Sequence, residues 1–362
     1  MQRSTRKWLL ALLAAGFVAL AVYQGRRFFG TGEFKGAKLL AAVRGADPFL
    51  LGLSVVAIYA CYALRALRWR VLQQNLGPAH FSTIYRLTLA GFAALFLLGR
   101  PGEPIRPLLL ARREKLPVAG LFGIYLLERL FDAASTLVIA ALGLLLISAR
   151  HDAHLGAGKF EGAFKAAGAA LGVGLAVAVA VLIYLRVHGT ALLERRVAAW
   201  QTTGSWKARI GRVVLGLERG LETIRSWREL TLALFYSAAH WILVLVIYLW
   251  ISHAFGGSLR ELNLGDAMLV MAFTMVGSVV QLPGVGGGSQ VGSFVAYTAI
   301  FGVEKEPATA VSIVLWLITF AAVSLLGAPL LVHEGFSLAQ LKEMAEHEKE
   351  EQERRESRGE AE

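Results

Sequence analysis

Cysteine and charge are both scarce in this sequence. The 362 residues include one cysteine, Cys61, which lies within an apolar run and has no second cysteine with which to form an internal disulfide. Charged residues make up 17% of the chain and hydrophobic residues 56%, and the mean hydropathy is +0.55. Several apolar runs reach the roughly 18 to 20 residues that cross a bilayer. The composition therefore excludes a soluble protein and predicts an all-α polytopic membrane protein.

The sequence also lacks motifs for nucleotide, metal and catalytic chemistry. It contains neither a G-x-x-x-x-G-K-[ST] loop nor a G-x-G-x-x-G turn after a strand, and no strand is predicted. His151 and His154 have no further ligand cluster nearby, so a solvated loop explains them better than a metal site. No nucleophile is paired with a base. We therefore expect no catalytic residue, no metal, no cofactor and no enzymatic activity.

Basic residues outnumber acidic ones, and their distribution indicates topology. The formal net charge is +11, but the tail from Ser337 holds nine glutamates and five basic residues, so the rest of the chain carries +15. Residues 186–228 form the most basic loop. Excess basic charge on a membrane protein marks cytoplasmic loops beside anionic lipid, so we expect membrane lipid and no nucleic acid as a partner.

Six apolar runs are predicted to cross the membrane fully, at 8–23, 48–67, 116–148, 166–185, 230–255 and 308–332. The first fits an uncleaved signal anchor better than a signal peptide, although Ala19-Leu20-Ala21 resembles a cleavage site. The basic loops then place both termini in the cytoplasm of a cell with a bacterial-type inner (plasma) membrane.

Two further apolar segments, 84–110 and 267–301, are interrupted by glycine and proline. Irregular backbone at membrane depth survives only where protein or a water-filled cavity satisfies its polar groups, and such breaks indicate transporter substrate sites. We interpret them as two re-entrant broken helices of opposite entry that face one another.

This topology predicts an inverted repeat with a site near the membrane midplane. A transmembrane domain would cover 1–336, with a first half at 48–185, a basic cytoplasmic connection at 186–228 and a second half at 229–332. Residues 337–362 would form a charged cytoplasmic tail.

Ionisable residues within apolar runs are the candidates for function, because a charge at the centre of a span costs roughly 2.5 to 3.5 kcal/mol. Two clusters qualify, one at the first break and one inside the run 116–148. They are Arg100, Glu103 and Arg106, and then Glu128, Arg129 and Asp132. Glu128 and Asp132 share one helix face, and Arg129 lies three residues from Asp132.

Two interpretations of these charges remain open. Arg129 could pair with a carboxylate and hold the first broken segment against the next span. Alternatively, the arginines could bind phosphate bidentately while the carboxylates meet a cationic group or carry protons. His240, alone within its span, is more typical of a hydrogen-bonded packing residue than of a proton relay.

The second break offers backbone N–H groups at the end of a half-helix, which would suit an anion. Its candidate residues are the glycines of the turn together with one proline and two glutamines. They are Gln281, Pro283, Gly284, Gly286, Gly287, Gly288 and Gln290. Arg65 and Arg68, at the basic end of the run 48–67, are candidates for interfacial phosphate contacts beside an interfacial tryptophan, Trp69.

Four motifs together resemble the lysylphosphatidylglycerol synthase transmembrane-region family. They are Arg65…Arg68-Trp69, Gly99-Arg-Pro-Gly-Glu103-Pro-Ile-Arg106-Pro, Leu127-Glu-Arg129-Leu-Phe-Asp132 and the late Pro-Gly-Val-Gly-Gly stretch. The resemblance extends to about Val332 and implies a flippase-like protein. Full-length synthases of that family add a soluble aminoacyl-transferase domain, for which the last 30 residues are too few. The resemblance thus implies translocation without synthesis. Gln290 stands where family members often carry a glutamate, a departure that argues against lysyl-lipid as the cargo.

The sequence therefore predicts a lipid flippase or transporter that moves a phosphate-containing headgroup, phospholipid or polyprenyl-phosphate-linked, between leaflets. The alternative is a non-transporting, lipid-binding accessory subunit of a lipid- or glycan-modifying membrane enzyme. A membrane-embedded transferase is the weakest hypothesis, because no reactive constellation is visible.

Overall fold

A computed structural model describes residues 36–99, 102–148, 223–278, 281–282 and 286–334, together with positions 166, 169, 172 and 173. The fold is all-α, as predicted. A short helix, α2 (Gly36–Gly45), precedes the first long helix, α3 (Pro48–Gln73). Asp47 caps α3 by accepting a hydrogen bond from the Phe49 backbone N–H at 2.9 Å, and Pro48 suits the first helical position.

Two other long helices pass through the bundle as continuous spans. They are α6 (Val118–Ser148) and α10 (Trp227–Ala254). Ser226 caps α10 by accepting from the Glu229 backbone N–H at 3.2 Å. The last span is one helical run from Lys305 to His333, in which a π-helical turn, η5 (Leu317–Ala321), separates α13 (Lys305–Trp316) from α14 (Ala322–His333).

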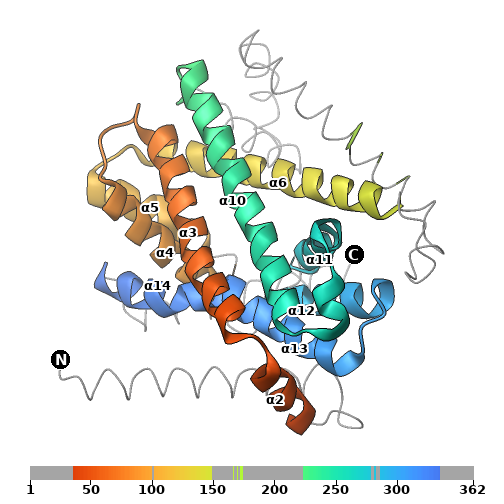
Figure 1. The fold of residues 1–362 in the computed structure, drawn as a ribbon. Helices are drawn as coiled ribbons and strands as arrows, with labels where there is room; N and C mark the ends of the chain where they lie inside the picture. Colours follow the sequence, from red (N-terminus) through yellow and green to blue (C-terminus); the bar gives the residue numbers. More distant parts are fainter. Residues whose placement is uncertain are drawn as a thin grey trace, which may run out of the picture.

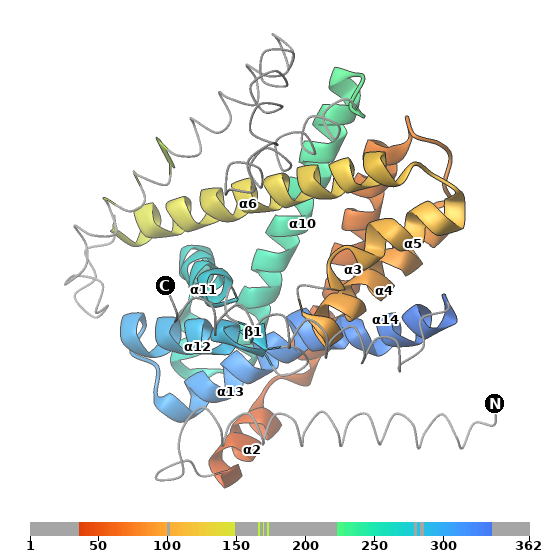
Figure 2. The same ribbon diagram turned by 180° about the vertical axis from the view of Figure 1, so that it is seen from behind.

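The helices pack in crossing pairs (Figure 1). α3 packs along α10, and α14 packs along the fourth apolar helix, α4 (Phe81–Leu98). Figure 2 shows α6 crossing α10 and extending toward the C-terminal half. The Tyr59 hydroxyl on α3 donates to the Ala322 carbonyl at the start of α14 at 2.6 Å. Elements from both halves of the sequence are therefore interleaved around one core.

The first broken segment is a helical hairpin. α4 ends at Leu98, and α5 (Ile105–Glu114) returns after the Gly-Pro turn. A Cβ added at Gly91 would lie 2.5 Å from the Arg106 Cβ, so only glycine lets α5 approach α4 this closely. At the far end of α5, Arg113 forms an ion pair with Glu334, which follows α14. The hairpin is thus attached to the end of the last span.

The second broken segment is also a helical hairpin. A 3-10 turn, η3 (Gly257–Glu261), leads into α11 (Leu264–Gly277), and α12 (Gly288–Val295) returns and continues as a π-helical turn, η4 (Ala296–Ile300). The prediction of no strand is wrong in one detail: β1 (Gln281–Leu282) pairs antiparallel with β2 (Gly286–Gly287) within the turn. A two-residue ladder satisfies backbone groups that the helix break would leave unpaired.

Five described helices are long and apolar enough to cross a membrane: α3, α4, α6, α10 and the run Lys305–His333. Four of them match predicted spans. The predicted spans 8–23 and 166–185 lie outside the described residues, apart from four helical positions in the second. At 18 residues, α4 also meets the criterion for a span, whereas α11 has 14. The number of spans, the re-entrant geometry and the inverted repeat remain predictions.

The close packing of the second hairpin gives a stability prediction. A Cβ at Gly277 would lie 2.0 Å from the Gly288 carbonyl oxygen, whereas one at Gly52 would meet nothing within 4 Å. We expect Gly277→Ala to lower the free energy of unfolding by about 1 to 3 kcal/mol through overpacking. Gly52→Ala should be neutral or slightly stabilising, because alanine favours helix. Thermal unfolding of both variants in detergent checks this; equal melting temperatures would contradict it.

Candidate functional site

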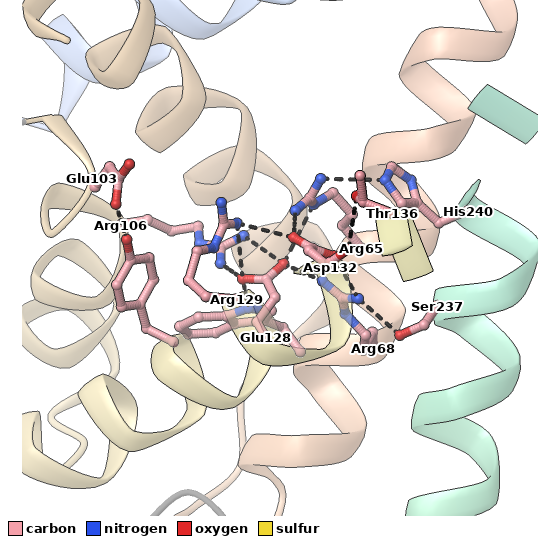
Figure 3. A network of polar contacts seen from close by, with 12 residues as sticks. Arg65, Arg68, Glu103, Arg106, Glu128, Arg129, Asp132, Thr136, Ser237 and His240 are labelled. Carbon is pink, nitrogen blue, oxygen red and sulfur yellow. Dashed lines mark hydrogen bonds and ion pairs between the residues drawn. The ribbon is translucent and has the colours of Figure 1, made fainter. Parts of the chain in front are cut away.

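Two helix faces with opposite charge meet at the centre of the bundle. Arg65, Arg68 and Trp69 lie at i, i+3 and i+4 on α3, so they share one side of that helix. Glu128 and Asp132 lie at i and i+4 on α6 and face them (Figure 3). The repeat of the helix therefore places two cations and an indole N–H against two carboxylates.

The Glu128 carboxylate receives donors from two helices. It accepts from the Arg68 Nη2 at 2.6 Å, the Trp69 Nε1 at 2.7 Å and the Arg65 Nε at 3.3 Å, all on α3. Arg106 on α5 also forms an ion pair with it. The side chains of Glu128 and Arg68 are both 0% exposed. A charge this deeply buried is tolerated only when it is paired and hydrogen-bonded, so these contacts hold the helices together.

Asp132 pairs with the arginines that connect the network to α10. It accepts from the Arg68 Nη1 at 3.0 Å and forms ion pairs with Arg65 and with Arg129, whose Nη2 lies 3.2 Å from its Oδ2. Arg68 also donates to the Ser237 hydroxyl at 2.8 Å, and the Arg65 Nη1 lies 3.2 Å from the His240 Nε2. Four helices, α3, α5, α6 and α10, are thus joined by one polar network.

Aromatic rings complete the environment of the arginines. The Arg106 guanidinium lies over the Trp69 ring, 4.2 Å from its centroid, and 5.5 Å from that of Phe92. Arg65 lies 4.8 Å from the Phe92 centroid. Cation–π contacts of this kind strengthen when the cation is removed from water. The rings therefore offset part of the cost of burying these cations.

The network has one formal positive charge in excess. It contains four arginines and three carboxylates. The third carboxylate is Glu103, which accepts a hydrogen bond from the Tyr125 hydroxyl. The members are Arg65, Arg68, Arg106 and Arg129, with Glu103, Glu128 and Asp132. We call these seven residues the charged cluster. An anion bound beside it would balance the charge.

A cavity of about 460 Å³ opens beside the charged cluster. Arg65, Glu103, Arg129, Asp132 and His240 supply its polar wall. Apolar side chains from α3, α4, α10 and η5 form the rest of the lining; they include Ile58, Phe92, Leu95, Phe96, Val244 and Phe320. The cavity therefore offers both polar and apolar surface, as an amphiphile requires.

Arg129 is the most exposed arginine of the charged cluster. Its side chain is 34% exposed, compared with 5% for Arg106 and 0% for Arg68. Its Nε finds no hydrogen-bond partner among the described residues. Arg129 also lies over the Tyr125 ring, 5.4 Å from the centroid, which orients the guanidinium. It can donate to an anion without leaving its place in the network.

The ends of both hairpins reach this cavity. Leu95, Phe96 and Gly99 at the end of α4 line it, and so do Met275 and Ser278 at the end of α11. The two broken segments therefore meet at one space, which agrees with the prediction that they face one another. η5 supplies Thr319 and Phe320, and π-turns within helices often occur at functional sites.

The structure separates the predicted residues of the first half. Glu103, Arg129 and Asp132 line the cavity, whereas Glu128 and Arg106 are enclosed within the network. Arg100 lies outside the described residues. Arg65, Arg68 and Trp69, for which we predict an interfacial position, are all buried and contact the carboxylates of α6. Their depth in the membrane stays a prediction.

The residues predicted at the second break do not line the cavity where the structure describes them. Pro283 and Gly284 are outside the described residues, and only the backbone of Gln281 and Gly286 is described. Of the remaining three, Gly287, Gly288 and Gln290, none is among the residues that line the cavity in the described part of the chain. The Gly287 N–H donates to the Gln290 side-chain oxygen at 2.5 Å, so this N–H stabilises the turn.

Sequence reasoning missed the contribution of α10. His240, Trp241, Val244 and Tyr248 follow one another along the cavity at i, i+1, i+4 and i+8. Tyr125, the hydroxyl partner of Glu103, was also missed. Ser237 and His240, a pair of polar residues at i and i+3 in an apolar span, could have indicated that one face of α10 contacts a polar site.

Comparisons with known proteins agree with this architecture. The family described as "Lysylphosphatidylglycerol synthase TM region" matches residues 8–327. A "UPF0104 membrane protein" of Methanothermobacter thermautotrophicus is 24% identical over 347 residues, covering 91% of this chain and 96% of that protein. No solved structure matches the chain.

The division between enclosed and cavity-facing charges predicts different stability effects. Glu128→Gln removes the charge that compensates several buried arginines, so we expect the free energy of unfolding to fall by about 3 to 5 kcal/mol. Arg129→Gln removes a partly exposed cation and should cost less than about 1 kcal/mol. Chemical denaturation of both variants in the same detergent checks this. A larger loss for Arg129→Gln than for Glu128→Gln would contradict the division.

Proposed function

This chain belongs to the lysylphosphatidylglycerol synthase TM region family of multi-pass membrane proteins, and on that premise we propose that it binds a phosphate-containing lipid headgroup in the cavity and moves it between leaflets. The observation that carries the proposal is the position of Arg129 on the cavity wall. It is the partly exposed arginine of a cluster with excess positive charge. A lipid phosphate would supply the balancing negative charge, and arginine binds phosphate bidentately.

The apolar wall supports a lipid rather than a free anion as the ligand. Leu95, Phe96 and Phe320 offer no hydrogen bond to a small, hydrated ion, and they would contact acyl or isoprenoid chains instead. With the phosphate at Arg129, the hydrocarbon would lie along this wall. The combination of polar and apolar surface thus suits an amphiphile better than inorganic phosphate.

The two hairpins support movement of the headgroup. Both present a helix end at the cavity, and both depend on a glycine contact, Gly91 against Arg106 and Gly277 against Gly288. Discontinuous helices around a central site are a feature of transporters that open alternately to the two sides of a membrane. We propose that the second hairpin moves relative to the charged cluster, which holds the first hairpin in place through Arg106.

The test is lipid scrambling in proteoliposomes, with fluorescent phosphatidylglycerol as the probe. We expect wild-type protein to exchange the lipid between leaflets faster than empty liposomes do. Arg129→Gln should slow this exchange by about 10- to 100-fold, because hydrogen bonds to a charged group contribute roughly 1.5 to 3 kcal/mol each. The initial rate of dithionite quenching measures the exchange.

Arg112→Gln is the matched control. Arg112 lies on α5 in the exposed part of the first hairpin, so the same change removes a charge away from the cavity. Its exchange rate should equal that of wild type. If folded wild-type protein exchanges no lipid but binds it through Arg129, a non-transporting accessory subunit becomes the function instead. If Arg129→Gln and Arg112→Gln behave alike, Arg129 is not the phosphate site.

A further inference from the structure

The face of α10 that lines the cavity carries three buried polar groups without a hydrogen-bond partner among the described residues: the Tyr248 hydroxyl and two ring N–H donors. The Trp241 Nε1 and the His240 Nδ1 are both buried without a partner among the described residues. Trp241 is 7% exposed and His240 is 4% exposed, and both line the cavity. Buried donors are normally paired, so an unpaired pair beside a cavity indicates a ligand that accepts hydrogen bonds there.

The contact with Arg65 fixes the tautomer of His240. The Arg65 Nη1 lies 3.2 Å from the His240 Nε2, and a guanidinium nitrogen can only donate. The Nε2 must therefore accept, and the proton of the neutral ring is on Nδ1. The Nδ1 is consequently a donor, like the indole N–H of Trp241, whose ring packs edge-to-face against the imidazole at 5.1 Å.

His240 continues the polar wall that begins at Arg129. Ion pairs connect Arg129 to Asp132 and Asp132 to Arg65, and Arg65 contacts His240 (Figure 3). The wall thus runs from Arg129 through Asp132 and Arg65 to a neutral end formed by His240 and Trp241. A headgroup bound with its phosphate at Arg129 could place its terminal substituent at the neutral end.

The donors define the chemistry of that substituent. We propose that His240 and Trp241 form a subsite for the hydroxyl oxygens of a phosphodiester headgroup, such as a glycerol or a sugar. A hydroxyl oxygen accepts from these donors, whereas an ammonium group has no lone pair with which to accept. The subsite therefore selects neutral, hydroxylated headgroups over cationic amines. This inference rests on the proposed lipid-binding function of the same cavity.

The experiment compares two lipids that differ only in hydroxyl groups. Dioctanoyl phosphatidylglycerol and dioctanoyl phosphatidylpropanol carry the same charge, chains and headgroup carbon skeleton. Isothermal titration of the purified full-length protein in detergent gives an affinity for each. We expect wild-type protein to bind phosphatidylglycerol at least about tenfold more tightly, because a site built to bond a hydroxyl discriminates against an analogue without it.

Trp241→Phe removes the indole N–H and keeps an aromatic ring, so the fold should be retained. It should reduce the preference for phosphatidylglycerol over phosphatidylpropanol, measured as the ratio of the two affinities, by about 5- to 10-fold. Trp316→Phe is the matched control. The Trp316 Nε1 is also buried without a described partner, but Trp316 does not line the cavity. This variant should keep the wild-type preference.

The outcomes separate this inference from the proposed function. If wild-type protein binds both lipids equally and Arg129→Gln weakens both, the phosphate site stands and the hydroxyl subsite is wrong. If neither lipid binds folded protein, both proposals fail. If phosphatidylethanolamine binds as tightly as phosphatidylglycerol, the selection against amines is overturned. An additional titration with dioctanoyl phosphatidylinositol distinguishes a ring polyol from glycerol as the preferred hydroxylated group.

Discussion

The arrangement of the helices depends on the ion pairs and hydrogen bonds that the Glu128 carboxylate accepts. This carboxylate is fully buried, and its oxygens accept from arginines on α3 and α5 and from the indole of Trp69. The desolvation cost of a buried carboxylate is several kcal/mol, and it is repaid only while all these donors stay in place. α3, α5 and α6 therefore have one relative position that satisfies the network. Through Asp132, that position also determines where Arg129 and Arg65 lie on the cavity wall.

Such a network allows the protein to keep charge available inside an apolar bundle. Arg68, Arg106 and Glu128 are enclosed, and they provide the electrostatic framework. Arg129 shares the framework through Asp132 but remains partly exposed to the cavity. A guanidinium that is already oriented by an ion pair and by the Tyr125 ring loses little conformational entropy on binding a ligand. The apolar side chains of the cavity would contact the hydrocarbon part of the proposed lipid.

Much of the fold follows from the sequence, because hydropathy and span length are local properties. α6, α10 and the last span begin and end within about three residues of the predicted positions, whereas α3 begins at the predicted residue but extends to Gln73, beyond the predicted end at residue 67. Glu128, Arg129 and Asp132 also stood out, since charge within an apolar run is costly and needs an explanation. The glycines at both breaks predicted two hairpins, whose ends meet at the cavity.

Residues whose roles depend on distant partners could not be predicted in the same way. Arg68 and Trp69 at the end of an apolar run have the same local pattern whether they face the lipid headgroups or a carboxylate on another helix. Only the contact with Glu128, 60 residues away, decides between these alternatives. His240 presented the same difficulty, because its role depends on Arg65, 175 residues away. Gly287 and Gln290 were selected for exposed N–H groups, but the side chain of Gln290 itself occupies one of them.

The pairing of α3 with α6 has a consequence for how the protein is made. The ribosome completes α3 before α6, so Arg65 and Arg68 reach the membrane before their carboxylate partners exist. Each unpaired arginine costs roughly 2.5 to 3.5 kcal/mol at the centre of a bilayer. α3 therefore gains its full stability in lipid only after α6 has been synthesised and inserted beside it. We therefore expect α3 and α6 to depend on one another for stable insertion into the membrane.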